Sequence, residues 1–457
     1  MLTPITRVLG RRQDAAKARG LRGFWRDQFG GVAIIYGIAL PGLIGLVGLG
    51  VESGYWYVGK RDLQTQADAG SLSGAWELAW HRDSQVTPAA TNEAVRNGFP
   101  NTPPTTSIAV NVPPTSGAFA GNTHAVEVIV TQEYRPMFAA LFHPDDVTIV
   151  ARAVSTLNAA GQACVLALNG TVSDAATNTG STDINAPDCT IAANSTADDA
   201  ISFSGNSTVL FKSAWTPGGV DFAGSTDTTL TDGANTKMWP LDDPYAGMPH
   251  TAPSGCGGNI NISNSGTTTV NTTGSGANAY RTVCSDIHLT NGKSIDFAPG
   301  IYWMKGSSLN VEGGTMTCST CTPGGAGVTF IFTTPANGNT NQIGTANING
   351  NATVVLNAPG PNEGATYQGV LFYQDPNTPK ASNKSATLNG GASTVLNGAM
   401  YFPNNEVQWS GNNNLAAACT VIIGDTVTFT GNSGFSVSDC ADQGVDINFT
   451  QKITLAE

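Results

Sequence analysis

The chain is 457 residues long, which allows two or three domains of ordinary size and excludes a single small module. Only 12% of its residues are charged, against about 25% in a typical soluble domain, and 54 glycines accompany many Asn, Ser and Thr residues. This composition is typical of strands and turns, with few long helices.

Charge is unevenly distributed along the chain. Residues 1–31 hold seven basic and two acidic side chains, about +5, although the net charge of the whole chain is −12. The remaining residues hold 14 Lys and Arg against 31 Asp and Glu, about −17. Nucleic-acid-binding proteins present basic surfaces, so this acidic main part argues against nucleic acid as a partner.

Residues 32–51 read VAIIYGIALPGLIGLVGLGV and contain no charge. Twenty helical residues span about 30 Å of hydrocarbon, so this segment predicts one transmembrane helix. The basic residues before it and Glu52 after it predict a bacterial inner-membrane protein with a cytoplasmic segment 1–31 and an exported remainder, periplasmic or surface-exposed. The alternative is a cleaved secretory signal, but such signals have apolar runs of roughly 7 to 15 residues, and no A-x-A cleavage site follows this one.

Three glycines of the apolar segment recur at three-residue spacing: Gly42, Gly45 and Gly48. Small residues let another helix approach closely, so these glycines are helix-packing candidates. The alternative is that glycine is simply frequent in membrane helices.

The region after the apolar segment predicts a helical continuation over residues 52–84 and a small α+β unit over residues 85–160. The continuation carries small side chains, which predicts close packing against another element. In chain order the α+β unit contains a Pro- and Thr-rich loop at 100–118, a strand at 125–130, a short helix at 135–142 and a strand at 147–157.

From residue 161 to 457 the chain is rich in Gly, Asn, Ser and Thr, and a pattern of apolar, polar, Gly, small polar and apolar residues recurs. The repeated glycines are Gly292, Gly313, Gly350, Gly390, Gly411 and Gly431, and ISFSGNSTVL at 201–210 has the same texture. The gaps are 21, 37, 40, 21 and 20 residues, and we interpret 37 and 40 as doubled periods that VTFIFTT (328–334) and GVLFYQ (369–374) fill.

A period of about 20 residues favours a right-handed parallel β-helix, a β-solenoid, in which each turn lays short strands on the strands before it. The alternative is a β-sandwich of antiparallel strands. WPLDDPYAGMP, at residues 239–249, is predicted to leave the repeating turns.

All eight cysteines follow the apolar segment, which is the distribution expected in an oxidising compartment. Pairing of sequence neighbours would join Cys164 to Cys189, Cys256 to Cys284, Cys318 to Cys321, and Cys419 to Cys440. Three of these separations approximate one turn, so the bonds would tie adjacent turns. Cys318-Ser-Thr-Cys321 also allows a redox or zinc motif, but no second cysteine pair or nearby His supports either, and we favour a local structural disulfide.

No hydrolase, nucleotide or metal signature occurs in the sequence. Polysaccharide cleavage would need clustered carboxylates, and the adjacent pairs Asp242–Asp243 and Asp198–Asp199 are better explained as solvated loops. We therefore predict a protein that is not an enzyme, with no catalytic, cofactor-binding or metal-binding residues.

The stretch FWRDQFGGVAIIYGIALPGLIGLVGLGVESGYWYVGKRDLQTQADAGSLSGA, residues 24–75, resembles the start of the TadE/TadG-like Flp pilus-assembly proteins. Shared features are Gly30 and Gly31 before the apolar helix, Glu52 and the aromatic residues 55–57 after it, and the R-x-L-Q helix at 61–69. Two features depart from this group. Pilins of this group carry Glu five residues after a processed glycine, and this sequence does not. Some members of the group also carry a D-x-S-x-S metal motif, which is absent from this sequence.

The resemblance implies a structural, membrane-anchored component of a Tad/Flp-type pilus assembly or secretion machinery, with the inner membrane and other platform proteins as partners. Two alternatives remain: a surface adhesin or carbohydrate-binding protein that contacts cell-surface glycans, and a polysaccharide-active enzyme.

Overall fold

The structure is a computed structural model, and it describes most of the chain beyond residue 27. The described residues are 28–141, 144–335, 343–349, 352–378, 385–389, 393–410, 414–415, 419–432, 434–437, 440, 443–445 and 449–457. They form two compact units. The N-terminal unit comprises the residues up to Leu78, Asp83–Thr156 and Leu455–Glu457, and the strand-stack unit comprises Ala79–Arg82 and Leu157–Thr454.

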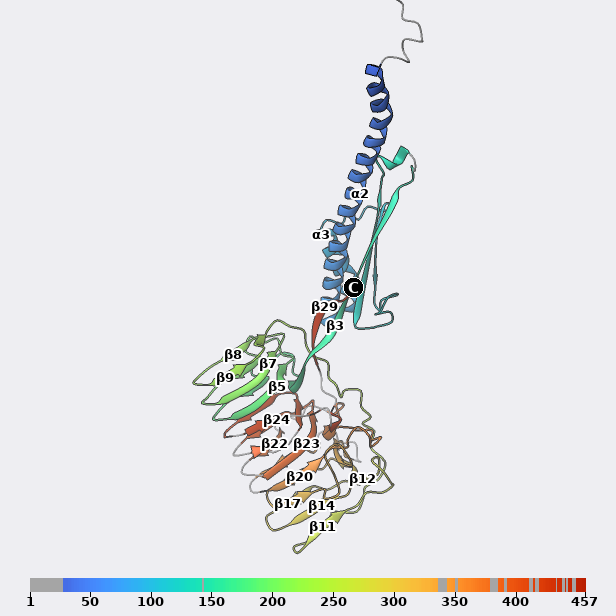
Figure 1. Ribbon diagram of the computed structural model, residues 1–457. Helices are drawn as coiled ribbons and strands as arrows, with labels where there is room; N and C mark the ends of the chain where they lie inside the picture. Colours follow the sequence, from blue (N-terminus) through green and yellow to red (C-terminus); the bar gives the residue numbers. More distant parts are fainter. Residues whose placement is uncertain are drawn as a thin grey trace, which may run out of the picture. The chain divides into compact units, whose positions relative to one another are not determined.

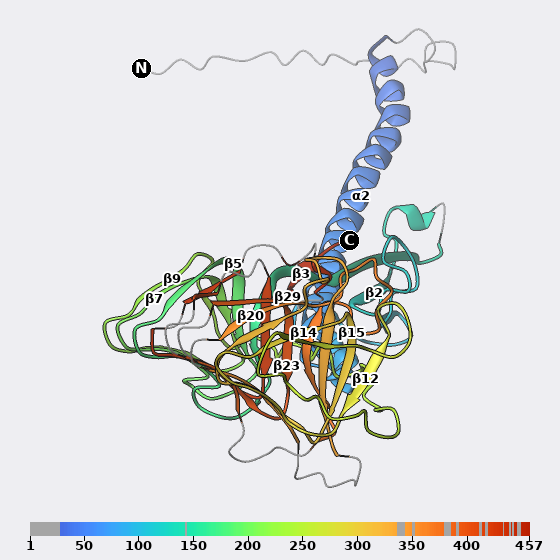
Figure 2. The ribbon, with the colours of Figure 1, turned by 90° about the horizontal axis from the view of Figure 1, so that it is seen from below.

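The N-terminal unit is built around one long helix, α2 (Gln28–Ala79), which runs without a break through the apolar segment and its predicted continuation (Figure 1, Figure 2). A shorter helix, α3 (Asp83–Arg96), follows it, with an acidic residue in its first turn and Arg96 in its last, as the helix dipole favours. Val86, Ala90 and Ala94 of α3 are buried.

Three antiparallel strands complete this unit: β1 (Thr106–Asn111), β2 (Ala125–Tyr134) and the first part of β3 (Val147–Ala167). The predicted strands at 125–130 and 147–157 are thus confirmed, and both are longer than predicted. The predicted loop at 100–118 is wrong in part, because β1 lies within it. The C-terminus joins the sheet, since the Val154 N–H donates to the Glu457 carbonyl at 2.9 Å.

The predicted short helix at 135–142 is also wrong. Residues 142 and 143 lie outside the described residues, and the described part of this stretch contains only the 3₁₀ turn η1 (Ala139–Leu141). Pro136 disfavours a helical conformation in the residue before it, and two backbone N–H groups of the stretch bond to a side chain of α2 instead of to a preceding carbonyl.

The strand-stack unit consists of short strands that pair in parallel in three stacks. Stack 1 is a nine-stranded sheet. Its strands, in pairing order, are β13 (Ile287–Leu289), β16 (Leu309–Val311), β19 (Ala346–Ile348), β22 (Ser385–Asn389), β24 (Glu406–Ser410), β27 (Val427–Thr430), β4 (Ala176–Asn178), β6 (Ile201–Phe203) and β8 (Val220–Phe222).

Stacks 2 and 3 belong to one larger sheet because several strands run from one stack into the next. Stack 2 contains β11 (Thr267–Val270), β14 (Ser294–Phe297), β17 (Thr315–Thr317), β20 (Thr353–Asn357), the start of β23 (Ser393–Phe402), β25 (Asn414–Leu415), β28 (Gly434–Ser436), the starts of β5 (Asp183–Ala193) and β7 (Thr208–Trp215), and β9 (Asp227–Leu230). Stack 3 contains β12 (Tyr280–Val283), β15 (Gly300–Lys305), β18 (Val328–Thr333), β21 (Val370–Gln374), the end of β23, β26 (Thr420–Gly424), the ends of β3, β5 and β7, and β10 (Ala234–Asn235). The last strand of the chain is β29 (Phe449–Leu455). The chain is therefore mainly β, with one long apolar N-terminal helix and parallel sheets.

The repeated glycines lie where the chain turns from stack 1 into stack 2. Gly205 separates β6 from β7 with φ of +87°, and Gly431 separates β27 from β28 with φ of +72°, a conformation that glycine adopts without steric cost. Gly350, Gly390 and Gly411 of the same pattern lie outside the described residues.

The interpretation of the 37- and 40-residue gaps as doubled periods is wrong. Leu309 of β16 pairs directly with Ala346 of β19, and Asn347 of β19 pairs directly with Thr387 of β22. Each gap is therefore a single turn, and its extra residues lie in connections between strands. An insertion outside the strands lengthens the sequence period without shifting the strand register.

The order of strands in the stacks differs from their order in the chain. β27 pairs with β4, β26 with the end of β3, and β28 with β5, so the last turn of the chain lies against the first (Figure 1). Residues 163–235 build one end of the stacks, and residues 267–436 begin at the other end. Residues 236–266, all of them described, contain no helix or strand and connect the two.

This connecting segment, residues 236–266, contacts stack 3 at several strands between its two ends. Its carbonyl groups accept hydrogen bonds from the side chains of β7, β21, β15 and β12. The donors and acceptors are Trp215 Nε1 to Trp239 (2.9 Å), Tyr373 Oη to Tyr245 (3.3 Å), Lys305 Nζ to Pro253 (2.9 Å) and Arg281 Nη2 to Gly258 (2.9 Å). The predicted excursion at 239–249 thus crosses the turns instead of forming one.

Candidate functional site around Glu52

The apolar half of α2 has almost no protein packed against it. Between residues 32 and 51 only Gly48 is buried, and Ile38 is 76% exposed. Exposed large apolar side chains of this half are Val32, Ile34, Ile35, Ile38, Leu40, Leu43, Ile44, Leu46, Val47, Leu49 and Val51. The segment is long and apolar enough to cross a membrane. A continuous exposed apolar surface of this size indicates a membrane or a protein partner.

Glu52 follows this apolar half and is 1% exposed. Its two carboxylate oxygens accept hydrogen bonds from the backbone N–H groups of Met137 and Ala139, each at 2.6 Å. Both donors lie in the connection between β2 and β3. A buried carboxylate needs such partners, and hydrogen bonds to a charged acceptor are among the stronger ones in proteins.

Phe138 lies between the two donors in the chain, and its ring covers Gly48. A Cβ atom at Gly48 would lie 2.7 Å from the ring, so only glycine leaves room for it. Leu43, Ile44, Val47, Gly48, Val51 and Phe138 line a shallow apolar groove. At Gly42 and Gly45 an added Cβ would meet no atom within 4 Å. Of the three helix-packing candidates, Gly48 is thus in contact with the chain's own loop.

Beyond Glu52, small residues let α2 lie close to the sheet and to α3. A Cβ at Gly59 would lie 2.6 Å from Tyr134, and one at Gly74 would lie 2.9 Å from Val126. Tyr134 also packs edge-on against Tyr55, with ring centroids 5.5 Å apart. The expected close packing of the helical continuation therefore has defined partners within the N-terminal unit.

A second buried carboxylate, Glu127 of β2, is 0% exposed and belongs to no motif of the sequence. Arg152 Nε donates to it at 2.6 Å, Asn111 Nδ2 at 2.8 Å, and the Thr115 hydroxyl and N–H at 2.7 and 3.0 Å. Burial alone would raise the pKa of Glu127, but these hydrogen bonds outweigh it and lower the pKa to about 2. Arg152 also pairs with Glu457. The available sequence signal was a charged residue inside the apolar run AVEVIV.

The eight cysteines form four disulfides, all in the strand-stack unit, and each joins sequence neighbours. The bonds are Cys164–Cys189, Cys256–Cys284, Cys318–Cys321 and Cys419–Cys440. Cys164–Cys189 joins β3 and β5 of adjacent turns, as predicted. The prediction that Cys256–Cys284 also ties adjacent turns is wrong, because Cys256 lies in the connecting segment and Cys284 follows β12.

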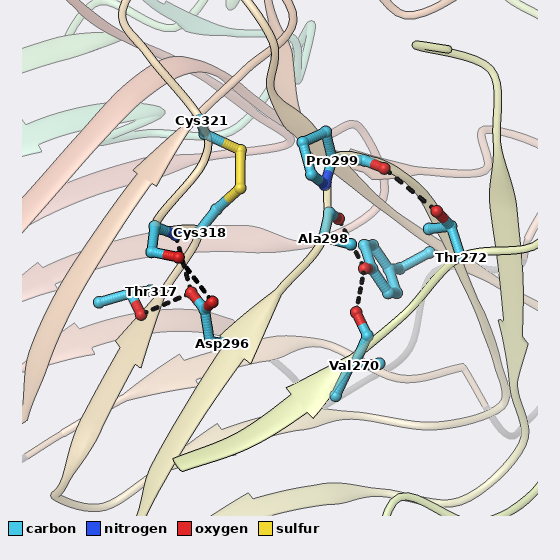
Figure 3. Close-up of a disulfide and its surroundings, with 10 residues drawn as sticks. Val270, Thr272, Asp296, Ala298, Pro299, Thr317, Cys318 and Cys321 are labelled. Carbon is cyan, nitrogen blue, oxygen red and sulfur yellow. Dashed lines mark hydrogen bonds between the residues drawn. A yellow bond between two sulfur atoms is a disulfide. The ribbon is translucent and has the colours of Figure 1, made fainter. Parts of the chain in front are cut away.

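Cys318–Cys321 closes a tight turn after β17 (Figure 3). Both cysteines are buried, and the neighbouring Asp296 accepts hydrogen bonds from Thr317 and Ser319. Burial of both cysteines supports a structural role for this C-x-x-C over a redox role, which requires an accessible thiol.

The carboxylate pairs considered for catalysis do not form a cluster. Asp243 accepts a hydrogen bond from Tyr401 at 2.8 Å, while Asp242 lies 3.0 Å from His81 and Asp198 lies 3.5 Å from Lys237. Among the described residues no group of three His, Cys, Asp or Glu side chains could hold a metal ion. These residues are accounted for by local hydrogen bonds and ion pairs.

The segment that carries Glu52, Gly48 and the small-residue contacts matches a family model described as putative Flp pilus-assembly TadE/G-like, over residues 30–77. Residues 30–77 are a TadE/G-like segment. The match covers the apolar half of α2, Glu52 and almost all of the helix that packs on the sheet, and it excludes the strand-stack unit. The description of the matched family names pilus assembly, and the match concerns this segment only.

No curated protein matches the chain. Among solved structures, the competence-associated pilin ComZ from Thermus thermophilus is 10% identical, with a TM-score of 0.16, over 84% of this chain and 98% of that one. A score this low carries no structural argument, so the TadE/G-like segment alone relates this chain to pilus assembly.

Proposed function

We propose that this protein is a structural, membrane-anchored component of a Tad/Flp-type pilus assembly or secretion machinery. The observation that carries the proposal is the division of the TadE/G-like helix. Its first half is apolar and exposed, and its second half is packed on an antiparallel sheet. One half thus suits a bilayer and the other holds a folded unit at its surface.

The proposed topology follows from charge and cysteine distribution. Residues 1–31 are cytoplasmic, 32–51 cross the inner membrane, and the helical continuation 52–84, the α+β unit 85–160 and residues 161–457 are exported. The basic lead supports this direction, and four disulfides support an oxidising compartment for the exported part.

We also propose that the three strand stacks form a right-handed parallel β-helix. Support comes from the pairing, because strands of successive turns pair in parallel in all three stacks. In such a fold each turn contacts only its neighbours, so the body extends along one axis, which suits a structural part.

The proposed partners are the inner membrane and other platform proteins. Gly42 and Gly45 remain helix-packing candidates, because the surface beside them is open for a second apolar helix. Gly48 is a weaker candidate, since Phe138 already covers it.

The test is a deletion strain scored for pili by electron microscopy, with the full chain and a Gly42→Leu/Gly45→Leu variant returned separately. We expect the deletion to lose pili and the full chain to restore them. The variant should remain in the membrane fraction but no longer co-purify with platform proteins.

Release of the full chain as a soluble protein would overturn the anchoring. Normal pili with lost attachment to glycan surfaces would favour an adhesin instead.

A further inference from the structure

The connection between β2 and β3 presents apolar side chains to its surroundings. Met137, Phe138 and Leu141 are 56%, 46% and 84% exposed. They are close together in the chain, and the charged residues Arg135, Asp145 and Asp146 that flank them are also exposed. An exposed apolar cluster with charged residues on both sides of it in the chain indicates contact with an apolar phase or partner.

This connection is held at a defined level of α2. Two hydrogen bonds fix it to Glu52, and Phe138 lies on Gly48, one helical turn toward the N-terminus. At 1.5 Å per residue, Gly48 is about 6 Å along the axis from Glu52, inside the apolar segment. If the segment spans a bilayer, Phe138 lies at the depth of its acyl chains.

Glu52 explains how a loop can reach this level. A free carboxylate at the edge of the hydrocarbon would be costly, and so would two unpaired backbone N–H groups. The N–H groups of Met137 and Ala139 donate to the two carboxylate oxygens, so the carboxylate and both N–H groups have hydrogen-bond partners. The exposed side chains of residues 137–141 are then apolar.

We propose that residues 136–141 are a second membrane contact, which inserts Met137, Phe138 and Leu141 among the lipids of the outer leaflet beside α2. The inference rests on the proposed function, since it requires that α2 spans the membrane. Two points of contact would fix the rotation of the N-terminal unit about the helix axis, which a single helix leaves free. The occupant is lipid because the cluster is continuous with the exposed apolar surface of α2 at Val47 and Val51.

The experiment places the photoreactive residue p-benzoylphenylalanine at one position at a time in the full chain, reconstituted in vesicles of phosphatidylethanolamine and phosphatidylglycerol. Leu141 tests the loop, and Ile38 reports the membrane anchor. Val112 is the matched control, because it is apolar, 41% exposed and follows β1 at the far end of the sheet. Its neighbour Asn111 pairs with Glu127, seven residues along β2 from Tyr134, or roughly 24 Å.

After irradiation, mass spectrometry should find lipid adducts at Ile38 and Leu141, several-fold above those at Val112. Adducts at Ile38 without adducts at Leu141 would overturn the second contact and leave the anchor intact. Absence at both positions would overturn the proposed function and this inference together. In native membranes, a protein adduct at Leu141 that replaces the lipid adduct would show that a partner helix, not lipid, covers the loop.

Discussion

The two units of this protein hold themselves together in different ways. The N-terminal unit depends on a few specific contacts: glycines that admit side chains from the sheet, and two buried carboxylates with complete hydrogen bonding. The strand-stack unit depends on many equivalent contacts, since each turn buries apolar side chains against the next and disulfides close some of the turns. The first arrangement is therefore sensitive to substitution of single residues, whereas the stabilising contacts of the second are spread over many residues.

The family match lies wholly on α2, in the N-terminal unit. A distributed structure tolerates insertions between its strands, as the 37- and 40-residue turns show. The comparison predicts that single substitutions destabilise the N-terminal unit, whereas the strand-stack unit is destabilised mainly by loss of its disulfides.

The largest effect is expected from loss of the turn-tying disulfide in Cys164→Ala/Cys189→Ala. This bond closes a loop of 25 residues, and the chain-entropy relation gives about 3.5 kcal/mol of stability. The matched variant Cys318→Ala/Cys321→Ala removes a bond with a separation of three residues, for which we expect about 1.5 kcal/mol. Urea denaturation of the full chain measures the loss of stability in each variant. Mass spectrometry of peptides from β5 follows the unfolding of the strand-stack unit.

All eight cysteines lie outside the N-terminal unit, so β2 peptides should be unaffected by either change. Equal losses in the two variants would show that the long loop gives no added stability.

Acid should weaken the N-terminal unit through Glu127. Its pKa falls from 4.5 in the unfolded chain to about 2 in the folded one, so the unfolded chain binds the proton first. The associated stability, on the order of 3 kcal/mol, is complete above about pH 4.5 and is lost as pH falls toward 2. Urea denaturation at pH 6 and pH 3, read from β2 peptides, should show the loss in the natural chain.

In Glu127→Gln no proton can be taken up at this position, so the same change of pH should cost less. An equal fall in both proteins would assign the acid sensitivity to other groups.

Overpacking should affect the N-terminal unit at Gly74. Gly74→Leu would place side-chain atoms against Val126 of β2, where a Cβ alone already lies at 2.9 Å, and we expect a loss of about 2 kcal/mol. Gly54→Leu is the control on the same helix, because nothing lies within 4 Å of its added Cβ, and it should be neutral or stabilising by up to about 1 kcal/mol. Urea denaturation read from β2 peptides compares the two, and similar results would contradict close helix packing.

Sequence patterns predicted the parts of the fold that depend on neighbouring residues. The apolar segment, the strands at 125–130 and 147–157 and the mainly β composition belong to this class. The pairing of β27 with β4 could not be predicted, because strands about 250 residues apart leave no spacing between them to interpret. Glycine spacing misled at 313–390 because connections of different length join strands whose register is unchanged.

The sequence predicts one half of the candidate site, the Glu52 side chain, and does not predict its partners. The sequence marks Glu52 as the residue that ends the apolar segment and as part of the TadE/G-like pattern, but its partners are 85 and 87 residues away and are backbone groups. A backbone donor has no side-chain signature. The apolar residues after Pro136 favour a helix, but Pro136 and the tertiary contact with Glu52 together decide otherwise.

The smallest effect, and the most local, is expected from Glu52→Gln. The amide retains one acceptor oxygen but turns an NH₂ group toward the second backbone N–H, so one charge-assisted hydrogen bond is lost. Such a bond contributes about 1.5 kcal/mol, which corresponds to about tenfold faster amide exchange at Met137 and Ala139. Hydrogen exchange of the peptide that covers 135–141 in the full chain measures it.

Glu133→Gln is the control, since it is the same substitution on an exposed residue three positions from Pro136. Exchange that rises equally in both variants would mean that Glu52 does not hold the loop. A rise confined to Glu52→Gln, with β2 and β3 unchanged, would show that one carboxylate sets the position of this loop while the sheet behind it stays folded.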